Sequence, residues 1–104
     1  MDRRIETRVI DTGGAAKTVV IQKDASKIWW LSVSPETVGT AGVIKIYDGF
    51  DADGKLAYQL ELGSARHPNF IPPIFCGQGI CIVNDANIAS YTLGYCPESW
   101  RKES

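Results

Sequence analysis

The chain has 104 residues, of which 44% are hydrophobic and 22% are charged, and its formal net charge is −1. A domain of this size and composition can bury a core without metal ions or disulfides. Its basic side chains are scattered along the sequence, unlike the clustered positive surface of a nucleic-acid-binding protein. We therefore expect a single domain over residues 1–104 and no nucleic-acid partner.

The sequence also gives no indication of membrane insertion or secretion. No segment reaches the roughly 20 apolar residues that a membrane-spanning helix needs. The segment Met1–Glu6 is too charged for the apolar core of a signal peptide. The three cysteines, an odd number, are more typical of reduced thiols than of a disulfide framework. We expect no membrane partner and a protein made in the cytoplasm.

Short apolar runs separated by Gly, Asp, Asn, Pro and Ser turns extend through the whole chain, and none has a helical period. This pattern predicts about eight strands. Pro72 and Pro73 place the sixth strand at a sheet edge or a corner, and residues 97–104 are expected to form a frayed tail. In chain order the strands are expected near Arg4–Ile10, Lys17–Gln22, Ile28–Ser34, Val43–Asp48, Leu56–Leu62, Phe70–Phe75, Ile80–Val83 and Ile88–Tyr95.

Alternation within these runs predicts which side chains face the core, because successive side chains of a strand point to opposite sides. The apolar sets expected to point inward are Trp29, Leu31 and Val33; Ile44 and Ile46; Leu56, Tyr58, Leu60 and Leu62; and Tyr91, Leu93 and Tyr95. One apolar face per strand is typical of two antiparallel sheets packed face to face. The expected fold is an all-β, jelly-roll-like antiparallel β-sandwich.

An acidic turn follows the fourth expected strand. Asp48, Asp51 and Asp53 supply three carboxylates within six residues, and carboxylate oxygen is the ligand type that calcium prefers. Their spacing does not match the calcium-binding EF-hand loop. Asp and Gly are also the usual residues of tight turns. We therefore predict a hairpin turn and no metal site.

The three cysteines and the one histidine are the candidates for metal binding, disulfide formation or nucleophilic catalysis. Cys76, Cys81 and Cys96 lack the short paired spacings of structural zinc sites, even if His67 is added. Cys76 and Cys81 flank a glycine-rich turn, and the sequence leaves open whether they face each other across a hairpin and pair on oxidation. Buried or half-buried free thiols are the preferred interpretation. Nothing beside His67 supports a nucleophile and base pair, so we expect no catalytic residue and no cofactor.

The remaining candidates are surface aromatic side chains. Trp30 follows Trp29 in the same expected strand, so its side chain is expected to point to the opposite, outer face. It would lie near Lys45 and Tyr47 if the third and fourth strands are neighbours. Trp100, in the expected tail, completes the candidate interaction surface. Aromatic groups at a surface fit either a protein interface or a platform on which a sugar stacks.

Five segments of the chain carry recognisable strand and turn motifs. They are Gly42–Gly49 (GVIKIYDG), Asp51–Leu56, Pro72–Ile74, Gly79–Ile82 and Asn87–Tyr95 (NIASYTLGY). In these segments the chain resembles small bacteriophage β-sandwich virion proteins, and the resemblance covers about Val19 to Pro97.

This resemblance implies a phage or prophage structural protein of the capsid or tail, often an oligomer, that is made in the bacterial cytoplasm and located in the virion. It carries no catalytic residues, and the cysteines are not part of it. The expected function is a non-enzymatic assembly protein whose partners are itself and other virion proteins. The main alternative is a carbohydrate-binding module that uses Trp30 or Trp100, and a second alternative is a small thiol- or metal-dependent enzyme.

Overall fold

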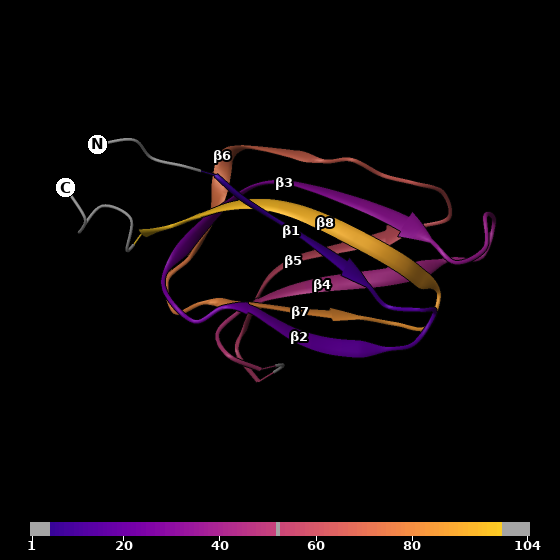
Figure 1. Ribbon diagram of the computed structural model, residues 1–104, viewed down its shortest axis with the longest axis horizontal. Coiled ribbons are helices and arrows are strands. Elements are labelled where there is room, and N and C mark those ends of the chain that lie inside the picture. The colour runs from indigo at the N-terminus through magenta and orange to yellow at the C-terminus, as the bar shows by residue number, and fades with distance from the viewer. Residues whose placement is uncertain (1–4, 52, 99–104) are drawn as a thin grey trace.

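Eight strands form two layers in the computed structural model, which describes residues 5–51 and 53–98 (Figure 1). Their number and order are as the sequence predicted, and most ends lie within two residues of the expected position. The strands are β1 (Glu6–Asp11), β2 (Lys17–Gln22), β3 (Ser26–Pro35), β4 (Gly42–Asp48), β5 (Lys55–Leu62), β6 (Asn69–Cys76), β7 (Ile80–Asn84) and β8 (Ile88–Pro97).

The strand order is that of a jelly roll. One sheet has the order β1-β8-β3-β6 and the other β2-β7-β4-β5, with every neighbouring pair antiparallel. Each strand before the β4–β5 turn pairs with its counterpart after it: β4 with β5, β3 with β6, β2 with β7 and β1 with β8. The chain is therefore one long hairpin rolled up so that alternate pairs enter opposite sheets. This confirms the predicted all-β jelly-roll sandwich.

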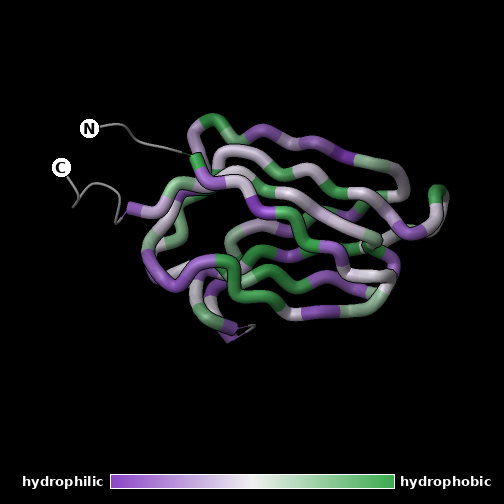
Figure 2. Tube along the Cα trace, viewed as in Figure 1, coloured by the Kyte–Doolittle hydropathy of each residue, from purple (hydrophilic) through white to green (hydrophobic). Residues whose placement is uncertain are grey.

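The core lies between the two sheets. Apolar and polar residues alternate along the strands (Figure 2), and the apolar set points inward as predicted for Ile44, Ile46, Tyr91 and Leu93. The large apolar side chains that are almost completely buried are Ile28, Leu31, Val33, Ile44, Ile46, Ile80, Ile82, Ile88, Tyr91 and Leu93. Aliphatic packing of this kind needs no help from a metal ion or a disulfide.

A bulge in β3 overturns one predicted core position. Ile28 pairs with Tyr95 and Trp30 with Gly94, so Trp29 is an extra residue between two consecutive partners on β8. An extra residue shifts the alternation by one. Ile28 therefore joins the core, whereas Trp29 is half-buried and lies outside the core cluster. The prediction that Trp29 faces the core was wrong.

A second bulge changes the start of β5. Tyr58 pairs with Ile46 and Leu56 with Tyr47, which leaves Ala57 as the extra residue. Ala57 packs against the core, whereas Leu56 is 46% exposed, so the prediction that Leu56 points inward was wrong. Downstream of the bulge the prediction holds, because Leu60 and Leu62 are buried.

β6 is an edge strand, as its prolines predicted. Ile74 pairs with Ile28 of β3, but the next pair along is Asn69 with Trp30. The intervening segment, which contains Pro72 and Pro73, therefore leaves the ladder, because proline has no amide hydrogen to donate. At the other end of the chain β8 continues to Pro97, one residue into the expected tail, and residues 99–104 lie outside the described part.

Alanine substitutions in β5 test the bulge. Leu60→Ala should lower the free energy of unfolding by about 2–5 kcal/mol because it leaves a cavity between the sheets. Leu56→Ala, the same substitution four residues earlier, should change it by less than about 0.5–1 kcal/mol because nearly half of Leu56 is exposed and the side chain lies outside the core cluster. Urea denaturation of both variants measures this difference. Equal losses would show that Leu56 faces the core and that the alternation is uninterrupted.

Candidate interaction surfaces

Trp30 lies on the outer face of the first sheet. Its cross-strand partner Gly94 sits between the buried residues Leu93 and Tyr95, so the missing side chain of Gly94 would point away from the core. A Cβ atom built on Gly94 would lie 2.2 Å from Nε1 of Trp30. The indole therefore occupies the space that glycine leaves open, and the contact half-buries it. Covering a glycine with a cross-strand aromatic ring is a known way to stabilise a sheet.

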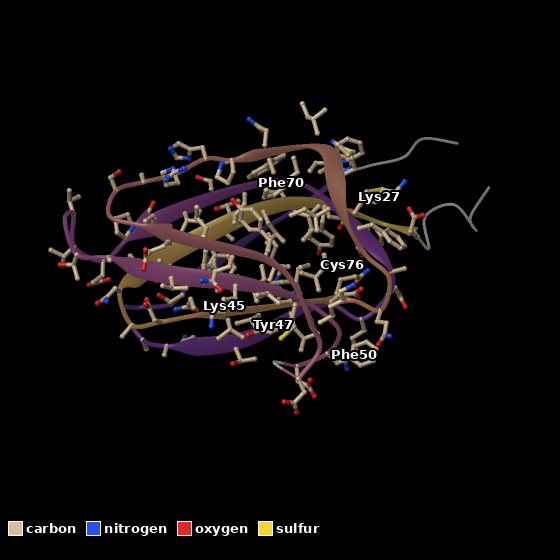
Figure 3. The ribbon with its side chains drawn as sticks, turned by 180° about the vertical axis from the view of Figure 1, so that it is seen from behind. Lys27, Lys45, Tyr47, Phe50, Phe70 and Cys76 are labelled. Atoms are coloured by element: carbon tan, nitrogen blue, oxygen red, sulfur yellow. The ribbon has the colours of Figure 1, made fainter. Side chains whose placement is uncertain are left out.

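Lys45 and Tyr47 lie on the opposite side of the molecule from Trp30. They alternate with Ile44 and Ile46, which point into the core, so both face outward from the second sheet (Figure 3). Because β3 and β4 belong to different sheets, the condition for placing Trp30 beside Lys45 and Tyr47 is not met. The candidates form two separate surfaces, and Trp100 lies outside the described residues.

Lys45 and Tyr47 line a groove of about 400 Å³ on the outer face of the second sheet. Lys45 has Gln59 on one side and Val83 on the other as cross-strand partners. Within the described part of the chain, the side chains of Lys45, Tyr47 and Gln59 have no hydrogen-bond partner. The groove thus combines an aromatic ring with uncommitted polar groups. Its complete lining is Ala16, Val43, Lys45, Tyr47, Gln59, Val83, Asn84 and Asp85.

A third feature was missed by the sequence reasoning. Among the described residues, seven large apolar side chains are exposed, and five of them lie on edge strands or directly before one. The alternation of polar and apolar residues was a usable signal for Val9. Apart from the two prolines of β6, nothing in the local sequence distinguished edge strands from central strands. The five are Ile5 and Val9 at β1, Leu56 on β5, and Ile71 and Phe75 on β6, with exposed fractions of 44%, 67%, 46%, 90% and 56%.

The acidic turn has a structural role. The carboxylate of Asp48 accepts hydrogen bonds from the backbone amides of Gly77 and Gln78, at 3.1 and 2.7 Å. Asp51 accepts one from the amide of Asp53 at 2.9 Å. β4 and β5 pair up to this turn, which confirms the predicted hairpin. In residues 5–51 and 53–98, no group of three or more His, Cys, Asp or Glu side chains is placed to hold a metal ion.

The cysteines are buried, as predicted. β6 carries Cys76 into the first sheet and β7 carries Cys81 into the second, so the two do not face each other across a hairpin. Both are buried free thiols. Burial, with the nearby Asp48 carboxylate, raises the pKa of Cys76 from 9.0 to about 12. Burial and Asp51 also raise the pKa of Cys81. Both thiols therefore stay protonated at neutral pH, whereas nucleophilic cysteines have lowered pKa values.

His67 is exposed in the β5–β6 loop, where its Nδ1 lies 2.7 Å from Oγ of Ser32. Ser32 belongs to the outer face of the first sheet, where its neighbours in the ladder include Thr92. The imidazole is thus engaged by a surface hydroxyl, while Cys76 belongs to the core. The described part of the chain contains no helix long and apolar enough to cross a membrane.

Comparison with known proteins gives fold similarity and no family. No protein-family model matches the sequence, and no curated protein matches it. A structure of Bacillus endospore appendages, described as disulfide-linked pili, matches with a TM-score of 0.49 and 11% identity over 92% of this chain and 88% of its own. The Drosophila NLP core, described in terms of pentamer formation and histone binding, has a TM-score of 0.49 and 12% identity over 86% and 94%.

The coat protein of Tobacco streak virus has a TM-score of 0.41 and 16% identity over 94% of this chain and 90% of its own. At these identities and scores the similarities carry no inference about what this chain binds. The class that its own strand order defines is the eight-stranded jelly-roll β-sandwich.

Substitution of Gly94 tests the Trp30 contact. Gly94→Ala should destabilise the fold by about 1–3 kcal/mol because the added methyl group and the indole cannot occupy the same space. Tryptophan emission should shift to longer wavelength as the indole moves into water. In a Trp30→Ala background the same glycine substitution should cost much less. Gly63→Ala is the matched control, since a Cβ atom there meets nothing within 4 Å. Equal costs for Gly94→Ala in both backgrounds would contradict the contact.

Proposed function

We propose that this chain is a non-enzymatic structural subunit of a phage or prophage virion that acts through contacts with copies of itself and with other virion proteins. The observation that carries the proposal is the position of its exposed apolar side chains. Five of the seven found among the described residues lie at edge strands, where the backbone also offers unpaired hydrogen-bonding groups.

Edges of this kind favour association for two physical reasons. An edge strand is a template for pairing with another chain unless charge, proline or a short strand protects it, as Pro72 and Pro73 do on β6. Covering a large apolar side chain fully is worth about 1.5–3 kcal/mol. Ile71 and Phe75 on β6, Leu56 on β5 and Val9 on β1 together supply apolar contacts on both sides of the sandwich.

The step from structural subunit to virion protein draws on the resemblance of the IYDG strand and turn and of the final SYTLGY strand to small phage virion proteins. Both segments belong to the scaffold, since the first forms the end of β4 with the start of its turn and the second forms most of β8. The protein would be made in the bacterial cytoplasm and located in the virion.

Mass measurements test self-association. Light scattering after size exclusion should show species larger than the 11.4 kDa monomer, in proportions that grow with protein concentration. Val9→Asp combined with Phe75→Asp should shift the population toward the monomer, because carboxylates would replace apolar contacts at two edges. Val38→Asp is the matched control, since Val38 is 78% exposed but lies in a loop. A parent protein that stays monomeric at all concentrations would contradict the proposal. Neighbouring genes that encode capsid or tail proteins would support the virion assignment.

A second candidate function is carbohydrate binding in the groove of the second sheet. The observation that favours it is the combination of the Tyr47 ring with the unpartnered side chains of Lys45 and Gln59. A sugar places its C–H face on an aromatic ring and its hydroxyls against such polar groups. Trp30 is less suited, because one part of its ring lies against Gly94.

Calorimetry with neutral oligosaccharides separates the two surfaces. If the groove binds sugar, Tyr47→Ala should weaken binding at least about tenfold, whereas Trp30→Ala on the other sheet should leave it unchanged. The reverse pattern would assign the sugar to the tryptophan surface. The absence of any heat with the parent protein would leave assembly as the function.

A further inference from the structure

The edge strand β1 has a sequence that complements itself. Glu6, Arg8 and Ile10 pair with Tyr95, Leu93 and Tyr91 of β8, which are core residues, so these three side chains point toward the inner layer. Thr7 and Val9 pair with Gly94 and Thr92 and point outward. The ladder to β8 uses one edge of β1, and the other edge is open within the described part of the chain.

Continuous pairing of two β1 strands with like faces on the same side requires a two-fold axis that passes through a residue, because faces alternate with a period of two. An axis at Thr7 places Glu6 of each copy opposite Arg8 of the other. It also places Ile5 opposite Val9, and both of these are exposed apolar residues on the outer side. Each contact then occurs twice, as symmetry demands.

Charge selects this register over its neighbours. An axis at Glu6 or at Arg8 would place two like charges directly opposite each other, which destabilises a strand pair. An axis at Val9 would pair Arg8 with Ile10 and Glu6 with Thr12, leaving both charges without an ionic partner. Among these four axes, the one at Thr7 pairs both opposite charges and both exposed apolar residues.

Arg8 is already positioned at this edge. Its guanidinium donates a hydrogen bond to the carbonyl of Ile21 on β2, at 3.2 Å, which holds the side chain between the edges of the two sheets. A guanidinium has five N–H donors, so this bond leaves others available for a carboxylate. An inward-pointing charge on an edge strand normally discourages pairing with another chain. Here Glu6 of a second copy supplies the charge that matches it.

We propose that two copies of this chain associate through antiparallel pairing of β1 about a two-fold axis at Thr7, which joins two four-stranded sheets into one of eight strands. The inference rests on the proposed function in so far as that function requires self-association. It specifies the edge, the register and the symmetry of one contact, and the apolar residues of β5 and β6 remain available for other partners.

Charge reversal tests the register. Glu6→Arg and Arg8→Glu each place like charges opposite one another in the homodimer, so each variant alone should associate at least about tenfold more weakly than the parent. An equimolar mixture of the two variants restores both Glu–Arg pairs, and it should form a heterodimer with near-parental affinity. Glu61→Arg on β5, an exposed position outside β1, is the matched control and should associate as the parent does. Thermal melting of each variant confirms that it is folded.

A cysteine at the axis provides a second measurement that does not depend on Arg8. Thr7 would face its own copy across the axis, at the separation of directly opposed residues, which is within reach of a disulfide. Thr7→Cys should therefore give a covalent dimer on treatment with diamide. Thr18→Cys, at an exposed position on the edge strand β2, should not.

The outcomes separate this inference from the proposed function. A parent protein that is monomeric at all concentrations overturns both. A parent that associates, with charge-reversal variants that associate equally well alone or remain monomeric when mixed, overturns the β1 contact and leaves self-association intact. Failure of the Thr7→Cys crosslink in an associating protein also rejects the axis. Weak association of each variant alone, recovery on mixing and a Thr7→Cys crosslink together support it.

Discussion

The packing of two apolar sheet faces against each other is the constraint on which the rest of this structure depends. Each strand must direct its aliphatic side chains toward the opposite sheet, and the roll of the chain places consecutive strands of the sequence in different sheets, except for the β4–β5 hairpin. Residues that are close in sequence, such as Trp30 and Lys45, therefore end on opposite outer faces. The same roll separates Cys76 from Cys81 across the sandwich.

The two bulges decide what the outer faces present. In β3 the extra residue Trp29 keeps Ile28, Leu31 and Val33 in the core and leaves both tryptophans half-buried on the surface. In β5 the extra residue Ala57 turns Leu56 out beside Tyr47. A bulge re-aims side chains and leaves its extra residue unpaired in the ladder. Here they make the surface more apolar than simple alternation would.

Edges distinguish this fold from a closed barrel. A sandwich of two open sheets has four edge strands, and in this protein three of them, β1, β5 and β6, carry exposed apolar side chains. The cysteine and histidine side chains, which the sequence offered for catalysis, are not part of these exposed apolar edges. Two thiols are buried with raised pKa values, and the imidazole is bound to a surface serine. The two thiols thus lie in the interior and the imidazole lies on the surface, while the exposed apolar edges offer contacts to other chains.

The sequence by itself determined the strands, because alternation and turn residues act over a few positions. Lys17–Gln22 was predicted to the residue, and the hairpin at Asp48–Lys55 follows from local turn chemistry. It also determined that Ile44, Ile46 and Leu93 face inward. Tertiary structure alone decided which strands are neighbours, and so where Trp30 lies relative to Tyr47. It also decided where a bulge interrupts alternation, since a bulge is defined by the partner strand, and which strands other than the proline-containing β6 are edges. The candidate surfaces depend on these long-range pairings, which is why the sequence could name their residues but could not assemble them.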